Sequence, residues 1–297
     1  MSTEVECVEQ LRQTGDFRVL ERFVPRSHYH TGDDGSVKKL AIYIDCECTG
    51  LSSEDDYVIE IGIVPFEFNS EGKIFRIFQP YNAFQEPPIP IPEEITELTG
   101  ISDEMVKGQQ IDFDEVEKIL SKASIIIAHN SSFDRPFLER LHGIFKEKAW
   151  GCSISDVAWR DEGVGSAKLD YLAYQYDFFF DGAHRATNDC HAGIHLLSQQ
   201  TPVTDMPVLK KLLDRARQTS RRIYAEKAPF EQKDVLKARG YRWNSGENGH
   251  PKAWWIDVEE SEYENEKAFL KDQIYHRSVD GLPVVTVDAF NRYSARV

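Results

Sequence analysis

The feature that most constrains the fold is an apolar run that ends in two acidic residues at alternate positions. Residues 41–44 (Ala-Ile-Tyr-Ile) are typical of a buried strand, and the Thr-Gly pair at 49–50 indicates a turn at its end. Because successive side chains of a strand point to opposite faces, Asp45 and Glu47 project from the same face. Adjacent carboxylates repel each other unless a cation lies between them, and such oxygen ligands suit Mg²⁺ or Mn²⁺. Taken alone, such a pair is more often part of a solvated rim.

A second acidic motif in an apolar setting, carrying the third acidic residue, follows the segment 124–130. This segment is typical of a buried strand, and it runs into a helix that begins near Ser131. Asp134 lies in the first turn of that helix, where a carboxylate is favoured by the helix dipole. The residue alone is therefore explained equally well as a capping group.

A third acidic motif, carrying the fourth acidic residue, lies at the start of another amphipathic helix. The helix is predicted to open near Thr187 or Asn188, which places Asp189 in its first turn. His184 then lies in the loop just before it. The three segments together indicate a cluster of carboxylates with a histidine beside it.

Three acid-bearing motifs thus follow one another along the chain. They are Asp45-Cys46-Glu47, Asn130-x-x-Phe133-Asp134 and His184-x4-Asp189. In this order and with these gaps they resemble the DEDDh family of 3′–5′ exonucleases, which includes the proofreading epsilon subunit of bacterial DNA polymerase III and, more distantly, RNase T and oligoribonuclease. The resemblance covers about residues 38–200. A His before the last Asp points to the His branch of the family, because the sister branch carries Tyr there.

The resemblance implies a site that hydrolyses phosphodiesters with two Mg²⁺ or Mn²⁺ ions. Asp45 would bridge both ions. Glu47 and Asp189 would complete the coordination of one ion, and Asp134 would hold the other partly through water. His184 would take the proton from the attacking water, a role that suits a side chain whose unperturbed pKa is near neutrality.

The resemblance also implies contacts with the 3′-terminal nucleotide. Cys48 stands where the family usually has Thr, which affects how the 3′ end is positioned but not the metal site. Leu98 either packs near the terminal base or is buried in the core. Arg185 either contacts substrate phosphates or is simply exposed. The full set of expected substrate-contacting residues is Cys48, Thr49, Gly50, Leu98, Asn130 and Phe133.

The chain is long enough for one large domain and a smaller one. We expect an N-terminal helix and loop at 1–37, the exonuclease domain at 38–204 and an accessory domain at 205–297. The N-terminal helix, apolar at positions 5, 8 and 11, is expected to pack on the exonuclease domain. That domain is expected to be an α/β fold of the ribonuclease H-like kind, with a mixed, mostly parallel five-stranded sheet and flanking helices. The polar segment 199–204 predicts a linker, and a hairpin and helices beyond it predict a small α+β fold.

Charge is distributed unevenly along the chain. The net charge is −15, which disfavours tight non-specific binding to duplex nucleic acid. Residues 205–255 are the exception, with 12 Lys and Arg against 6 acidic residues. Aromatic residues interleaved with Lys and Arg in this stretch are typical of a surface that binds single-stranded nucleic acid. An equally good explanation is that its Trp residues form the core of the small domain.

Two further observations concern the cellular setting. Residues 1–30 contain no apolar run of signal-peptide length, and no segment approaches the about 18 apolar residues of a membrane span. Five cysteines without Cys-x-x-Cys spacing fit reduced thiols. We therefore expect a cytoplasmic protein without a membrane partner.

The leading prediction is a metal-dependent 3′–5′ exonuclease that releases nucleoside monophosphates from single-stranded DNA or DNA 3′ ends by two-metal hydrolysis. A polymerase or another replication or repair protein is the expected partner. An RNA 3′–5′ exonuclease of the same fold, similar to RNase T or oligoribonuclease, is an alternative because no residue reports contact with a 2′-hydroxyl. A non-catalytic nucleic-acid-binding module is a second alternative, but it has no need of four acids and a histidine.

Overall fold

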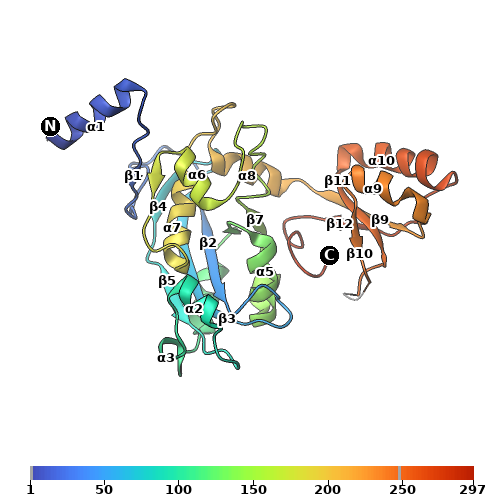
Figure 1. Ribbon diagram of the computed structural model, residues 1–297, viewed down its shortest axis with the longest axis horizontal. Helices are drawn as coiled ribbons and strands as arrows, with labels where there is room; N and C mark the ends of the chain where they lie inside the picture. The colour runs from blue at the N-terminus through green and yellow to red at the C-terminus, as the bar shows by residue number, and fades with distance from the viewer. Residues whose placement is uncertain (1–2, 247–248) are drawn as a thin grey trace. The chain divides into compact units, whose positions relative to one another are not determined.

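Two main sheets organise the chain, one in each of two units, Met1–Arg215 and Ala216–Val297. The computed structural model describes residues 3–246 and 249–297. Figure 1 draws the first unit from blue to yellow and the second in orange and red.

The main sheet of the first unit is mixed. Its described strands are β2 (Lys39–Cys48), β3 (Val58–Phe68), β4 (Ile74–Ile77), β5 (Tyr81–Phe84), β6 (Ile125–Ala128) and β7 (Trp150–Cys152). They lie in the order β4-β3-β2-β6-β7, with β5 also paired to β3. The pairings β2–β3, β3–β4 and β3–β5 are antiparallel, whereas β2–β6 and β6–β7 are parallel.

The mixed α/β sheet with flanking helices is confirmed, but two details of the prediction are wrong. The described part of the sheet has six strands rather than five, and antiparallel pairings outnumber parallel ones. The sequence suggests a single strand over 75–80, but the chain leaves β4 after Ile77 and starts β5 at Tyr81. Pro80 explains the break, because proline has no backbone N–H to donate to a sheet.

Helices flank the sheet, and short elements join them. The described helices of this part are α1 (Thr3–Thr14), α2 (Glu93–Thr99), α3 (Asp103–Val106), α4 (Phe113–Ser121), α5 (Ser131–Leu141), α6 (Leu169–Gln175), α7 (Ala186–Leu197) and α8 (Val208–Arg217), with a 3₁₀ turn at Gly143–Lys146. The short strands β1 (Glu21–Arg22) and β8 (Phe178–Phe179) pair in parallel with each other.

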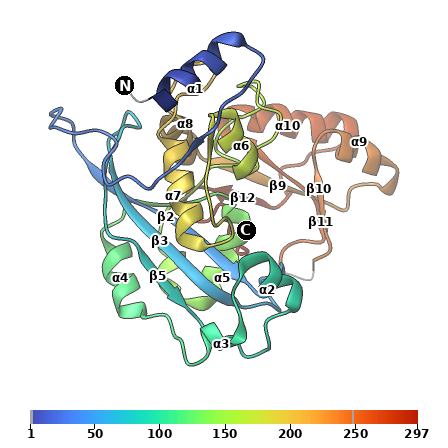
Figure 2. The same ribbon diagram turned by 60° about the vertical axis from the view of Figure 1, so that its left-hand side comes forward.

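The helix α7 packs directly on β2 and β3, as Figure 2 shows. Gly193 makes this possible, because a Cβ at that position would clash with the ring of Tyr43 on β2. Tyr43 is itself fully buried, and its hydroxyl lies 3.1 Å from the Ser153 hydroxyl. The close approach brings the N-terminal end of α7 to the end of β2.

The boundary between the units falls later than expected. We predicted a second domain from residue 205, but the division lies between Arg215 and Ala216. The reason is that α8 belongs to the first unit for most of its length, with Val208 and Leu212 fully buried. Leu212 lies against Gly151 of β7, where a Cβ would come within 2.7 Å of the leucine side chain.

The N-terminal helix does not pack as predicted. α1 is exposed along nearly its whole described length, and its apolar residues Val5 and Leu11 are 53% and 39% exposed. Three apolar residues in a short helix offer too little area to hold it against a sheet domain. The ion pair between Arg12 and Glu21, 2.6 Å, ties its last turn to β1.

The second unit has a four-stranded antiparallel sheet in the order β10-β11-β9-β12, with helices on one face. Its described elements are β9 (Ser220–Glu226), a 3₁₀ turn (Phe230–Gln232), α9 (Lys233–Ala238), β10 (Arg242–Asn244), β11 (Ala253–Glu259), a 3₁₀ turn (Glu260–Glu262), α10 (Tyr263–Phe269), a π-helical turn (Leu270–Tyr275) and β12 (Val284–Val287). The predicted hairpin is formed by β10 and β11, and residues 247–248 of its loop lie outside the described residues.

The tryptophans of this unit divide between its core and its surface. Trp254 packs against the buried cluster around Ile223 and Leu236. Trp255 points to the opposite face of β11, where the Arg222 guanidinium carbon lies 3.9 Å from its ring centroid. The explanation of the tryptophans as core residues therefore applies to Trp254, and nucleic-acid binding by Trp255 stays a prediction.

Membrane-spanning potential and the state of the cysteines can be assessed over the described residues. No helix among these residues is long and apolar enough to cross a membrane. All five cysteines are free thiols, and all except Cys7 are buried.

Candidate active site

The end of β2 presents two carboxylates on one face. Ile42 and Ile44 on this strand are fully buried, whereas Asp45 and Glu47 are half-buried. The antiparallel register with β3 shifts between Glu47 and Cys48. Such a bulge bends the end of a strand and redirects its side chains, as is common beside active sites.

The first turn of α7 brings a third carboxylate to the same place. Carboxylate oxygens of Asp45, Glu47 and Asp189 all lie within 4.8 Å of one another. The backbone of α7 can come this close because β3 has a glycine opposite it. A Cβ on Gly62 would lie 2.5 Å from the carbonyl carbon of Ala186. Segments about 140 residues apart in sequence are thus brought together.

Asp134 reaches the end of β2 from the other side. The parallel partner β6 ends at Ala128, so on that side of β2 the N–H of Cys46 lies beyond the strand pairing. The Asp134 Oδ1 accepts that N–H at 3.2 Å, and the Cys46 thiol donates to the same oxygen at 3.4 Å. The Asp134 carboxylate therefore binds the backbone of β2 in addition to lying in the first turn of α5.

Burial raises the pKa values of all four carboxyl groups, and the charges of nearby acids add to the effect for Asp45, Glu47 and Asp189. Burial raises the pKa of Asp45 well above its ordinary value, and the nearby charges of Asp134 and Asp189 add to the effect. Burial, followed by the charge of Asp189, raises the pKa of Glu47 to about 7. Burial also raises the pKa values of Asp134 and Asp189 to about 7. Arg185, which lowers the pKa of Glu47, is the positive side chain among the groups that shift these pKa values.

The donor set fits a hard divalent cation. Mg²⁺ binds oxygen at about 2.0–2.1 Å, so oxygens on opposite sides of one ion are about 4 Å apart. The oxygens of Asp45, Glu47 and Asp189 lie within 4.8 Å of one another, so small side-chain adjustments would bring them onto one ion. Asp134 lies outside that group but close enough to raise the pKa of Asp45. A cation among these oxygens would remove the repulsion that raises their pKa values.

His184 lies where the sequence predicts, in the loop before α7. Its side chain is exposed, and its backbone has a φ of 62°, in the left-handed region that residues other than glycine rarely adopt. The backbone N–H of His184 donates to Asp189 Oδ2 at 3.0 Å. The turn therefore connects the histidine directly to one of the clustered acids.

The residues at the end of β2 that are expected to contact substrate mostly form hydrogen bonds and packing contacts within the protein. The Thr49 hydroxyl donates to Asp56 Oδ1 at 3.2 Å and accepts the N–H of Tyr57 at 3.0 Å, and Thr49 is buried. A Cβ on Gly50 would overlap the Asp56 carboxylate. Cys48 is 5% exposed. These residues shape the turn after β2, and their contact with a nucleotide stays a prediction.

The other expected substrate contacts are accessible. Leu98 is 52% exposed, so the explanation of it as a core residue is wrong, whereas its neighbour Ile101 is fully buried. Asn130 is exposed, and its side chain does not cap α5. Phe133 is half-buried, with its ring centroid 5.0 Å from that of Phe137. Their contact with a nucleotide also stays a prediction.

One buried acid beside the clustered carboxylates was not predicted from the sequence. Glu60 is fully buried in the middle of apolar β3 and lies directly opposite Glu47 in the register. It forms an ion pair with Arg185, with Nη2 and Oε1 3.0 Å apart. A single acid within the run Val58–Val64 is the signal that could have identified it.

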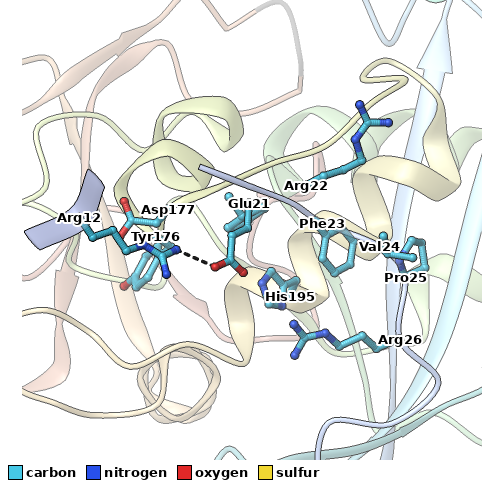
Figure 3. Close-up of a pocket in the computed structure, with 11 residues that line it drawn as sticks. Arg12, Glu21, Arg22, Phe23, Val24, Pro25, Arg26, Tyr176, Asp177 and His195 are labelled. Atoms are coloured by element: carbon cyan, nitrogen blue, oxygen red, sulfur yellow. Dashed lines mark hydrogen bonds and ion pairs between the residues drawn. The ribbon is translucent and has the colours of Figure 1, made fainter. Parts of the chain in front are cut away.

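A separate cavity of about 410 Å³ lies between the segment that follows α1 and the end of α7 (Figure 3). The Phe23 and His195 rings stack there at 4.6 Å, with Arg26 beside them. Burial lowers the pKa of His195 to about 4, so this imidazole is neutral at pH 7. As far as the chain is described, none of the four clustered acids lines this cavity, and it is not the candidate active site.

Comparison with known proteins agrees with this geometry. The chain matches the exonuclease (RNase T) family over residues 42–197. A DNA polymerase III of the PolC type from Caldanaerobacter subterraneus subsp. tengcongensis is 31% identical over 173 residues, 54% of this chain and 12% of that protein. The DNA polymerase III subunit epsilon of Treponema pallidum is 28% identical over 163 residues, 52% of this chain and 73% of that protein. The chain therefore corresponds to only a small part of the PolC-type relatives.

Solved structures show the same fold. The zinc-bound complex of Escherichia coli exonuclease I with single-stranded DNA has a TM-score of 0.51 and 14% identity, covering 74% of this chain and 63% of that one. Another exonuclease I structure also has a TM-score of 0.51, with 15% identity over 84% of this chain and 63% of that one. At such identities the likeness concerns the fold alone.

Proposed function

The chain belongs to the exonuclease family, and on that premise we propose that it is a metal-dependent 3′–5′ exonuclease that releases nucleoside monophosphates from DNA 3′ ends. The observation that carries the proposal is the group of three carboxylates, Asp45, Glu47 and Asp189, within 4.8 Å of one another. Asp134 lies beside them. The four acids come from three separate segments, so their convergence is a property of the fold.

The four acids are the metal ligands of the proposed site. Asp45, Glu47, Asp134 and Asp189 would hold two Mg²⁺ or Mn²⁺ ions. These ions, when bound, would neutralise charge that develops on the attacking and leaving oxygens of the phosphodiester. The acids have no lysine or arginine among the residues that dominate their pKa values, apart from Arg185 near Glu47. A cation is therefore the partner that this site requires.

His184 would take the proton from the attacking water. Its position in an exposed loop directly before α7 leaves the imidazole accessible to water and substrate. The hydrogen bond from its N–H to Asp189 keeps the loop beside the acids.

The substrate we propose is a single-stranded DNA 3′ end. Its relatives include a DNA polymerase III of the PolC type and a DNA polymerase III subunit epsilon, which favours DNA over RNA for this chain. An RNA 3′–5′ exonuclease is the second candidate. Exposed Leu98 and half-buried Phe133 would pack against the terminal nucleotide. A replicative or repair polymerase in the cytoplasm is the partner that fits this activity.

We assign the second unit to single-strand binding. Trp255 lies between two guanidinium groups, with the Arg222 carbon 3.9 Å and the Arg242 carbon 5.4 Å from its ring centroid. Arg242 is exposed and lies on an edge strand of the sheet. Alternating cationic and aromatic groups suit a phosphate backbone with unstacked bases.

The decisive experiment compares 3′-labelled DNA and RNA single strands of the same sequence with Mg²⁺, with Mn²⁺ and with EDTA. We expect labelled mononucleotide from DNA when either cation is present, and none in EDTA. Asp45→Ala should abolish release while the far-ultraviolet circular dichroism spectrum stays unchanged. Preferential release from RNA would favour the second candidate, and no release from either strand would indicate a binding module without catalysis.

A further inference from the structure

Glu60 is a carboxylate that the proposed chemistry does not use. It is fully buried on β3, yet both of its oxygens are engaged. Oε1 accepts from Asn82 Nδ2 at 3.0 Å and from Arg185 Nη2 at 3.0 Å. Oε2 accepts from Arg185 Nε at 3.2 Å and from the backbone N–H of Ala186, also at 3.2 Å. One side chain therefore binds two consecutive residues of the turn that leads into α7.

A buried acid at this position is unfavourable by itself. Glu60 lies directly opposite Glu47 in the register, so two carboxylates face each other across β2 and β3. The charge of Glu60 contributes to raising the pKa of Glu47. An apolar side chain at position 60 would avoid both the desolvation and the repulsion. The contacts of Glu60 with Arg185 and Ala186 offset these costs and join the sheet to the turn before α7.

The turn that Glu60 binds is the one that carries His184. Arg185 follows His184 directly, and its guanidinium also lies over the ring of Phe84, 5.6 Å from the centroid. Ala186, the next residue, is pressed against β3, where Gly62 leaves room for it. Residues 185 and 186 are thus held from one side by the sheet.

The other side of the turn is held by α7. The N–H of His184 donates to Asp189 Oδ2, and the backbone of His184 has a φ of 62°. A non-glycine residue keeps such a conformation only when its surroundings impose it. Glu60 on one side and Asp189 on the other supply that constraint.

We propose that Glu60, acting through Arg185, is a positioning group that fixes the backbone turn of His184 beside the clustered acids. Arg185 is then not a phosphate contact, and neither explanation suggested by the sequence describes its role. The inference rests on the proposed exonuclease function for its kinetic consequence, but not for its structural one. Glu60 does not touch the reacting atoms.

The structural test is amide hydrogen exchange in the metal-free protein. In Glu60→Gln the N–H of Ala186 and the guanidinium of Arg185 lose a charged acceptor. We expect peptides within 181–190 to exchange at least about tenfold faster, and peptides from the rest of α7 to be unchanged. Glu67→Gln, a half-buried glutamate on the same strand, is the matched control and should leave exchange unchanged. Equal exchange in the wild type and Glu60→Gln would overturn the proposal.

The kinetic test separates positioning from phosphate binding. For Glu60→Gln and for Arg185→Gln we expect kcat to fall about 10- to 100-fold with little change in KM. The double variant should be no worse than the more severe single one, because both changes break the same contact. Arg185→Lys, which keeps the charge but not the bidentate geometry, should recover only part of kcat.

Two outcomes would contradict the proposal. If Arg185 binds phosphate, Arg185→Gln raises KM, weakens the salt dependence of binding, and combines additively with Glu60→Gln. If Glu60 only stabilises the fold, kcat per folded molecule and its pH profile stay unchanged while the melting temperature falls. A wild-type protein without nuclease activity would refute the proposed function alone, because the exchange experiment does not depend on catalysis.

Discussion

Replacing Glu47 by glutamine should stabilise the metal-free protein above neutral pH. Burial and the charge of Asp189 raise the pKa of Glu47 from 4.5 to about 7. Between these two values the folded protein binds more protons than the unfolded chain. The free energy of unfolding therefore falls as the pH rises from about 4.5 to about 7, and it stays low above that range. Glutamine carries no charge at any of these pH values, so in Glu47→Gln this residue no longer lowers the free energy of unfolding as the pH rises.

The magnitude follows from the size of the shift. A shift of about 2.5 pKa units corresponds to about 3.4 kcal/mol, and between pH 5 and pH 8 about 2–3 kcal/mol of this is lost. At about 2–4 °C per kcal/mol, the melting temperature of the wild type should fall by about 4–12 °C over this range from Glu47 alone.

The assay is thermal unfolding in EDTA at pH 5 and pH 8, in which the unfolding transition of the first unit is followed. We expect Glu47→Gln to melt above the wild type at pH 8 and close to it at pH 5. Adding Mn²⁺ should raise the melting temperature of the wild type far more at pH 8 than at pH 5, because the ligands must be deprotonated. Glu54→Gln, at an exposed position, is the control. An equal pH dependence in the wild type and Glu47→Gln would refute the electrostatic account of the site.

Three further predictions concern other parts of the molecule. Gly62→Ala should displace the first turn of α7, since its Cβ would lie 2.5 Å from the Ala186 carbonyl carbon. It should lower nuclease activity, and in an unfolding assay it should lower stability by about 1–3 kcal/mol. Gly143→Ala, with open space around it, should do neither. His184→Ala should reduce kcat by about 10²- to 10⁴-fold while Mn²⁺ binding measured by calorimetry persists, and an unchanged kcat would exclude it as the base. Trp255→Ala should weaken binding of a fluorescent single strand by about tenfold, and unchanged affinity would assign Trp255 to structure alone.

The acids of the site were predictable because each follows from a local rule. The period of two places Asp45 and Glu47 on one face of β2, and helix-start signals place Asp134 and Asp189 in the first turns of α5 and α7. What these rules leave open is whether the segments meet. The resemblance of the motifs supplied that expectation, and the geometry of the carboxylates now agrees with it.

The features that were missed depend on contacts between distant segments. Glu60 is explained only by Arg185, which lies 125 residues later in the chain. The exposure of Leu98 depends on which side of its short helix faces the core. The sequence of α1 contains an apolar stripe, but a stripe does not show whether a surface is available to cover it. In each case the local sequence does not specify the partner that decides where the side chain lies.

The central claim is that the clustered acids form a site for divalent cations, and Mn²⁺ soaked into crystals of the protein tests it most directly. Anomalous diffraction should locate one Mn²⁺ among Asp45, Glu47 and Asp189 and a second beside Asp134, and neither should appear in crystals of Asp45→Asn. Saturating Mn²⁺ that leaves no anomalous signal between these carboxylates in the wild type would contradict the account.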